Sequence, residues 1–166
     1  MIDDLSSIQV IVEIPMGSRN KYEYDPESGF FKYDRMLFSS VHYPSDYGFI
    51  RDTLAGDGDA LDALVLVSEP TFPGCLIEAK PLGLFKMWDE KGEDDKILCV
   101  PVKDPKWNWL NTLADVPEQL LREITHFFQV YKELEEKKTD VEGWEGLEDA
   151  NRVIRESRAA YEKQKD

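Results

Sequence analysis

Two apolar runs joined by an acidic turn decide the fold expected for this chain: they form residues 76–102, LIEAKPLGLFKMWDEKGEDDKILCVPV. We predict strands over Leu76–Met87 and Lys96–Val102, because both runs are apolar and carry β-branched or aromatic side chains. The connection contains Lys91-Gly92 and is too short for a helix of ten residues. The pair therefore indicates an antiparallel hairpin.

Other short apolar runs fill the first 112 residues or so. We predict further strands at Gln9–Ile14, Gly29–Tyr33 and Ala63–Val67, bounded by turn residues such as Asp25-Pro26 and Pro73-Gly74. Most of the gaps between these runs are too short for a crossover helix. This half of the chain therefore favours a mostly antiparallel sheet or a small barrel over βαβ units.

The last 50 residues are predicted to form two helices. Asp115, with Glu118 three residues later, has the pattern of an N-cap and capping box, and Pro117 would lie in the first turn. Apolar residues then recur every three or four positions, at Leu120, Ile124, Phe127, Tyr131 and Leu134. A second amphipathic segment follows Gly143, with apolar residues at Leu147, Ala150, Ile154 and Tyr161. The run Lys132–Lys138 is interpreted as a solvated helix end.

Composition limits the classes of function. The chain has 166 residues, which fits a single domain over residues 1–166, and 20 Lys and Arg against 34 Asp and Glu give a net charge of −14. That charge disfavours nucleic-acid and anionic-membrane partners. The opening MIDDLSSIQV lacks a secretory signal, and no apolar stretch is long enough to span a membrane. Cys75 and Cys99 fit neither a disulfide scaffold nor a zinc pattern. We expect a cytoplasmic protein.

The most informative stretch is the acidic cluster Asp57-Gly58-Asp59-Ala60-Leu61-Asp62. Three carboxylates in six residues, just before an apolar strand, favour a hard divalent cation, which binds oxygen ligands. The alternative is an ordinary acidic surface turn. An EF-hand does not fit, because its sixth and twelfth loop positions would be Asp62 and Ser68 instead of Gly and Glu.

Other charged side chains interrupt or flank the predicted strands. The second acidic turn, Asp89 to Asp95, ends at Lys96, and such mixed charge suits a site for both cations and an anion. Glu13 lies inside an apolar strand, where a charge is costly unless it is paired or bound to metal. Lys21 and Glu23 alternate along the chain and would share one face. In each case a solvated surface position is the alternative.

Two further elements complete the set. Arg35 could bind a phosphate through its planar guanidinium group. The aromatic turn Tyr43–Phe49 includes Tyr47, whose phenol is a hydrogen-bond donor. A surface arginine and a packed aromatic loop are the alternatives.

These motifs, in this order, resemble the soluble family I inorganic pyrophosphatases of the short prokaryotic type. The resemblance is collinear over about residues 8 to 148 and rests on Ile11–Pro15, Lys21–Glu23, Asp57–Asp62, Lys86–Asp89 and His126–Lys132. One departure is Ala60, where the family usually has proline. The resemblance implies a small closed β-barrel of OB type with two C-terminal helices packed outside. It also implies hydrolysis of pyrophosphate to two phosphates with several Mg²⁺ ions.

The resemblance also implies residue roles. Asp57, Asp62 and Asp94 would hold the tightest metal, and Asp62 would be shared with a second one. Asp89 and Asp94 would meet metals that arrive with the substrate, and Glu13 and Glu23 would act through waters. Asp59 would accept a proton from the attacking water. The ligands of the phosphate oxygens would be Lys21, Arg35, Tyr47, Lys96, Tyr131 and Lys132.

The carboxylates in this set outnumber the cationic side chains, so divalent cations would supply the missing positive charge. Through these cations an acidic protein could bind a polyanion.

Three other functions remain open at this stage. A metal-dependent phosphohydrolase of nucleotides would need a base or sugar platform, for which we find no motif. An OB-type binding module without chemistry is disfavoured by the net charge. A calcium-binding structural domain is disfavoured by the failed EF-hand pattern.

A homo-oligomer, and by resemblance a hexamer, is the expected assembly. The apolar residues of the first helix cover an arc of about 180°, from Val130 through Leu120 to Leu121, at 100° per residue. That arc is wider than a helix packed on one small barrel requires, and exposed apolar patches often mark interfaces. His126 lies just off the arc, where it could make assembly sensitive to mild acid. The alternative is that the second helix covers the extra arc within one subunit.

Overall fold

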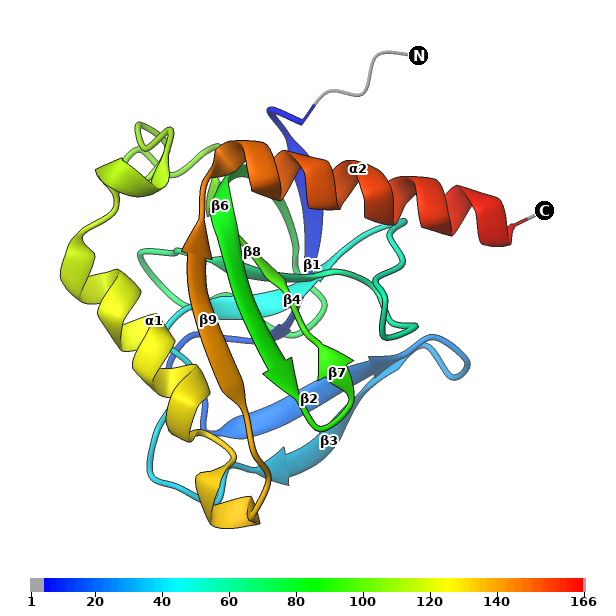
Figure 1. The fold of residues 1–166 in the computed structure, drawn as a ribbon, viewed down its shortest axis with the longest axis vertical. Helices are drawn as coiled ribbons and strands as arrows, with labels where there is room; N and C mark the ends of the chain where they lie inside the picture. The colour runs from blue at the N-terminus through cyan, green and yellow to red at the C-terminus, as the bar shows by residue number, and fades with distance from the viewer. Residues whose placement is uncertain (1–4, 166) are drawn as a thin grey trace.

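The computed structural model describes residues 5–165, and five of its strands close into a ring (Figure 1). The ring contains β1 (Ile8–Ile14), β4 (Asp46–Ile50), β5 (Asp62–Val65), β8 (Lys96–Pro101) and β6 (Leu76–Asp89). Each strand pairs with the next, and β6 pairs back onto β1. All of these pairs are antiparallel except β5 with β8. The expected OB-type barrel is confirmed.

Four shorter strands extend this ring. β2 (Asn20–Asp25) and β3 (Phe30–Met36) form a separate antiparallel hairpin that lies against β1. β7 (Gly92–Glu93) and β9 (Asp140–Glu145) both pair with the long strand β6. The acidic turn after β6 is therefore a hairpin turn, as predicted.

Two long helices pack outside the barrel, α1 (Glu118–Val130) and α2 (Leu147–Gln164), with short 3₁₀ turns at η1 (Leu113–Asp115) and η2 (Glu133–Glu135). They belong to different apolar clusters. Phe128 of α1 packs in the cluster that contains Leu64 and Leu98. Ile154 of α2 packs with the residues next to Leu64 and Leu98 in the chain, whose side chains point to the opposite face of their strands. None of the helices within residues 5–165 is long and apolar enough to cross a membrane.

Four strands, β2, β4, β7 and β9, lie outside the predicted strands, and two of them contain a glycine at a position that matters for pairing. β4 lies inside the predicted aromatic turn, and its Gly48 approaches β1 so closely that a Cβ would collide with the backbone oxygen of Ile11. In β9, Gly143 has φ +121° at an irregularity in the pairing with β6. In both strands the glycine serves strand pairing.

The start and end of α1 also differ from the prediction. Asp115 belongs to η1, where its carboxylate accepts hydrogen bonds from the backbone N–H groups of Asn111 and Thr112, at 2.9 and 3.2 Å. The helix begins at Glu118, after Pro117, and ends at Val130, so Leu134 lies beyond it with a 64% exposed side chain. Of the opening segment MIDDLSSIQV, residues 1–4 lie outside the described residues.

Candidate active site

Lys96 is the buried charge around which the candidate site is built. The parallel pairing of β5 with β8 places it opposite Asp62, and its side chain is only 1% exposed. Its Nζ lies 3.2 Å from Asp62 Oδ2, 3.1 Å from Asp94 Oδ2 and 2.8 Å from the hydroxyl of Tyr47. Burial lowers the pKa of Lys96, but the two carboxylates outweigh it and leave that pKa raised. The ammonium group therefore remains charged.

Aromatic rings connect this charge to helix α1. Lys96 Nζ lies 5.1 Å from the ring centroids of both Tyr47 and Phe128, which is within cation–π distance. The Tyr47 hydroxyl also donates a 2.7 Å hydrogen bond to Asp62 Oδ2. Barrel and helix thus fix the position of one lysine.

The acidic cluster forms the loop that enters β5. Gly58 turns the chain with φ +91°, and the Asp59 backbone N–H donates to Asp57 Oδ1 at 3.0 Å. Burial raises the pKa of Asp57, and the negative charges of Asp59 and Asp94 raise it further. These interactions place Asp57 near both carboxylates, and Asp57 and Asp59 are both exposed. The loop therefore presents its carboxylates beside Asp94.

Glu13 connects the barrel to the β2–β3 hairpin. It sits at an irregularity in the pairing of β1 with β4, and its Oε2 accepts the backbone N–H of Tyr24 at 2.9 Å. Burial raises the pKa of Glu13 to about 7, and the charge of Asp62 adds to this effect. The carboxyl group of Glu13, which the sequence places inside an apolar strand, is therefore largely buried and faces the site.

The hairpin contributes two cations that share one carboxylate. Lys21 Nζ lies 2.7 Å from Glu23 Oε1 and 3.5 Å from Asp34 Oδ2. Arg35 pairs with the same Asp34 and, across the molecule, with Glu135, whose Oε1 lies 2.7 Å from Arg35 Nε. The side chains of both cations are mostly buried.

The chain after α1 completes the site. Lys132 Nζ lies 3.4 Å from Asp89 Oδ2 and from Glu90 Oε1. Burial raises the pKa of the Tyr131 phenol, as do the charges of Asp94 and Asp89. The run Lys132–Lys138 is not the solvated helix end that we expected, because the side chains of Lys132 and Glu135 are largely buried.

The structure thus brings the predicted site residues from six separate segments to one region, although Asp59 is joined to the rest only through Asp57. Sequence reasoning missed Glu90, Asp34 and Glu135 as partners of the cations. Asp34 could have been proposed because it adjoins Arg35. For Glu135 the sequence carries no such signal, since its neighbours form a run of surface-like charges.

A divalent cation fits the donor set of the site. Across residues 5–165, no three Asp, Glu, His or Cys side chains already converge closely enough to hold a metal ion. The available donors are nevertheless carboxylate oxygens, which Mg²⁺ prefers. Burial raises the pKa of Asp62 to about 7, partly opposed by Lys96 and reinforced by Asp94. One ammonium group therefore does not fully compensate these acids, and a cation would relieve their repulsion.

Comparison with known proteins gives a consistent result. The inorganic pyrophosphatase family matches residues 10–162. An inorganic pyrophosphatase of Methanosarcina mazei is 58% identical over 156 residues, covering 94% of this chain and 92% of that protein. One of Halalkalibacterium halodurans is 54% identical over 154 residues, covering 93% and 94%. The solved inorganic pyrophosphatase of Thermus thermophilus superposes with a TM-score of 0.93 at 42% identity, covering 98% and 95%. The chain therefore belongs to the inorganic pyrophosphatase family.

Proposed function

We propose that this enzyme hydrolyses inorganic pyrophosphate to two phosphates with Mg²⁺, at the site around Lys96. The observation that carries the proposal is the interleaving of buried cations with buried carboxylates. Lys96 lies between Asp62 and Asp94, and Lys132 lies beside Asp89. Such a site has too many acids to bind a polyanion alone and suits a polyanion that arrives with metal. Family membership supports the same reaction.

Carboxylates from three segments would hold the metal ions. Asp57, Asp62 and Asp94 are the ligands of the tightest Mg²⁺ in this proposal, and Asp62 is shared with a second ion. Asp89 and Asp94 meet the ions that accompany the substrate, and Glu13 and Glu23 contribute through waters. Enzymes of this family generally need divalent metal, and Mg²⁺ favours such oxygen donors. When bound, the metal supplies a water of lowered pKa.

Asp59 is the proposed general base. It lies in the exposed loop at Gly58, next to Asp57, so a water near the metal carboxylates would be within its reach. Its carboxylate accepts the proton of the attacking water. A positioned base of this kind typically contributes 10²–10⁴-fold to a rate.

The phosphate oxygens are bound by side chains from four parts of the fold. The proposed set is Lys21, Arg35, Tyr47, Lys96, Tyr131 and Lys132. Without metal, the charge of Lys96 is taken up by Asp62 and Asp94. Cations on those carboxylates would leave the ammonium charge free to act on phosphate. Phosphoryl transfer depends mainly on such positioning and charge neutralisation.

Phosphate release tests the proposed function. We expect turnover of pyrophosphate with Mg²⁺, loss of turnover in excess chelator and recovery when Mg²⁺ is restored. ATP with Mg²⁺, and both substrates with Mn²⁺, test for a nucleotide phosphohydrolase. Undiminished hydrolysis in chelator, with metal content verified as nil, would refute the metal-dependent mechanism. Faster turnover of ATP than of pyrophosphate would refute the substrate.

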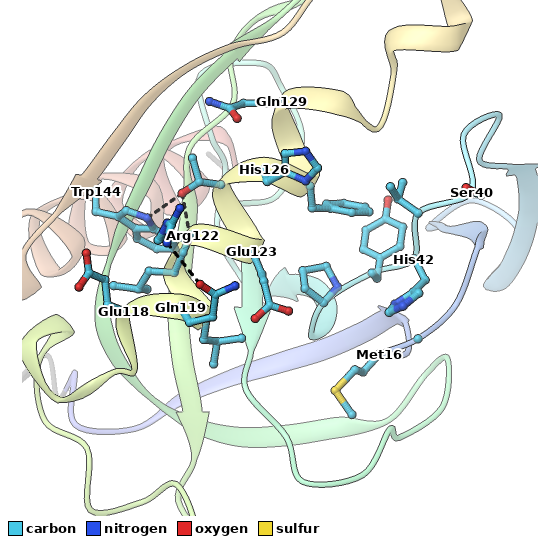
Figure 2. Close-up of a pocket in the computed structure, with 18 residues that line it drawn as sticks. Met16, Ser40, His42, Glu118, Gln119, Arg122, Glu123, His126, Gln129 and Trp144 are labelled. Carbon is cyan, nitrogen blue, oxygen red and sulfur yellow. Dashed lines mark hydrogen bonds between the residues drawn. The ribbon is translucent and has the colours of Figure 1, made fainter.

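The enzyme is further proposed to form a homo-oligomer, with a hexamer as the expected size. A groove of about 1170 Å³ runs beside α1, between its residues Glu118 to Gln129 and the segment Ser40–Pro44 (Figure 2). Leu120, Leu121 and Val41 line it, and His126 and His42 lie at its wall. The second helix packs in the other apolar cluster. Because α2 packs elsewhere, a neighbouring subunit is favoured over α2 as the element that covers the wide apolar arc of α1.

The cytoplasm is the proposed location. Cys75 and Cys99 are both free thiols in the structure. Free thiols are typical of reducing compartments. Inorganic pyrophosphate is the only small-molecule partner proposed, and the net charge of −14 supports neither a nucleic-acid nor a membrane partner.

A further inference from the structure

We infer that Glu135 is a positioning residue that orients the guanidinium group of Arg35 toward the substrate. The inference rests on the proposed role of Arg35 as a phosphate ligand. It assigns a function in that reaction to the 3₁₀ turn η2, which follows the proposed phosphate ligands Tyr131 and Lys132 in the chain.

The ion pair between the two residues is close and shielded. Arg35 Nε lies 2.7 Å from Glu135 Oε1, and the Glu135 side chain is only 5% exposed. Its second oxygen, Oε2, is buried and makes no hydrogen bond to the residues that the structure describes, and Arg35 Nε likewise makes none, so the contact is a charge pair and not an aligned hydrogen bond. A buried carboxylate oxygen without a hydrogen-bond partner is energetically costly. The acid therefore compensates the charge of Arg35 without satisfying its own hydrogen-bonding capacity.

The arrangement of partners around Arg35 fixes the direction of its guanidinium plane. Asp34, the neighbouring residue on β3, pairs with Nη1, while Glu135 approaches Nε from the other chain segment. Two anions on different nitrogens restrict rotation more than one does. Arginine binds phosphate through a planar fork, so the orientation of that plane determines whether it can bind in a bidentate manner.

The position of Glu135 along the chain joins two groups of phosphate ligands. It follows Tyr131 and Lys132 by four and three residues, in the turn η2. Arg35, in contrast, comes from the β2–β3 hairpin, which lies outside the barrel ring. The ion pair therefore joins the hairpin that carries Arg35 to the turn η2, whose N-cap is Lys132.

A double-mutant cycle between Glu135→Gln and Arg35→Ala tests the inference. We expect Glu135→Gln to lower kcat/KM for Mg²⁺–pyrophosphate by about 10-fold, because small misplacements of a binding group are costly. In the Arg35→Ala background the same change should cost less than about twofold, since the group to be oriented is gone. Glu133→Gln, an exposed glutamate of the same turn, is the matched control and should keep wild-type kinetics.

Melting temperatures separate positioning from folding. Glu135→Asp retains the charge on a shorter side chain, so it replaces Glu135→Gln in the cycle if the glutamine variant does not fold. Equal losses of kcat/KM in both backgrounds would overturn the role of Glu135 while leaving Arg35 and the proposed function intact. Wild-type kinetics for Arg35→Ala would overturn both the phosphate role of Arg35 and this inference.

Discussion

Asp62 and Lys96 face each other across the parallel pair of β5 and β8, with Lys96 Nζ 3.2 Å from Asp62 Oδ2 and the lysine almost fully buried. The same ammonium group lies 3.1 Å from Asp94 Oδ2. One side chain thus neutralises part of the charge of two proposed metal ligands. With the proposed roles of these residues, stability, metal binding and catalysis would depend on one another at this position.

Lys96→Ala is expected to destabilise the metal-free protein. Removing one partner of a buried ion pair leaves its carboxylates uncompensated, which typically costs about 3–5 kcal/mol. Mg²⁺ should recover part of the lost melting temperature, because divalent ions can replace the missing charge, while kcat/KM stays low. Thermal unfolding in chelator and in Mg²⁺ measures both effects. Lys91→Ala, in the exposed turn nearby, is the control; equal melting temperatures for the two variants in chelator would contradict the prediction.

Asp59→Asn should lose about 10²–10⁴-fold in kcat and keep its melting temperature. The side chain is exposed, so the substitution removes proton acceptance without disturbing the core. Steady-state kinetics and calorimetric Mg²⁺ titration distinguish this variant from Asp62→Asn, which should weaken metal affinity instead. Asp52→Asn, also exposed and in the same connection between β4 and β5, should behave as wild type. Normal turnover of Asp59→Asn at neutral pH would exclude it as the base.

The metal-free protein should lose stability as the pH rises from 5 to 8. The pKa of Glu13 is about 7 in the folded protein against an ordinary value of 4.5. Between these values the folded state retains a proton that the unfolded chain has released, so unfolding becomes easier as the pH rises. The loss is complete above pH 7 and is on the order of 3 kcal/mol. The free energy of unfolding in chelator, measured across this range, gives the slope.

Glu13→Gln removes this titration and should flatten the pH dependence of stability. Asp62, whose pKa is raised to about 7, and Asp95, whose pKa is raised to about 6, both by burial, would contribute to the slope that remains. Glu27→Gln, at an exposed turn position of the β2–β3 hairpin, serves as the control and should keep the wild-type slope. The prediction fails if Glu13→Gln loses as much stability between pH 5 and 8 as wild type does.

Sedimentation at neutral pH should show a species of about 115 kDa, six times the 19.2 kDa of one chain. If His126 makes the assembly acid-sensitive, wild type should dissociate in part at pH 5, where an imidazole is charged, whereas His126→Ala should stay assembled. Identical behaviour of the two proteins at pH 5 would remove the role of the histidine. A single 19 kDa species at micromolar concentration would refute the assembly itself.

Local sequence patterns determined much of this protein. The apolar runs that became β1, β6 and β8 start within one residue of their observed positions, because short runs of apolar, β-branched and aromatic residues bounded by turn residues are a local signal for strands. The cluster from Asp57 to Asp62 indicated a cation site from residue types alone, since three carboxylates in six residues are the oxygen ligands that a hard divalent cation takes. Family resemblance then supplied the order of the remaining motifs.

Tertiary structure alone decided what surrounds each charge. Lys96 is 34 residues from Asp62 in the chain, and only the parallel pairing of their strands brings them together. Glu135 lies in a charged run that is typical of a solvated surface, yet the fold buries it against Arg35, 100 positions earlier in the chain. The segment Tyr43–Phe49 was predicted as an aromatic turn, but its Gly48 lies in a strand, where a side chain would collide with β1. Burial and long-range pairing depend on the whole chain, so residue types and spacing could not reveal them.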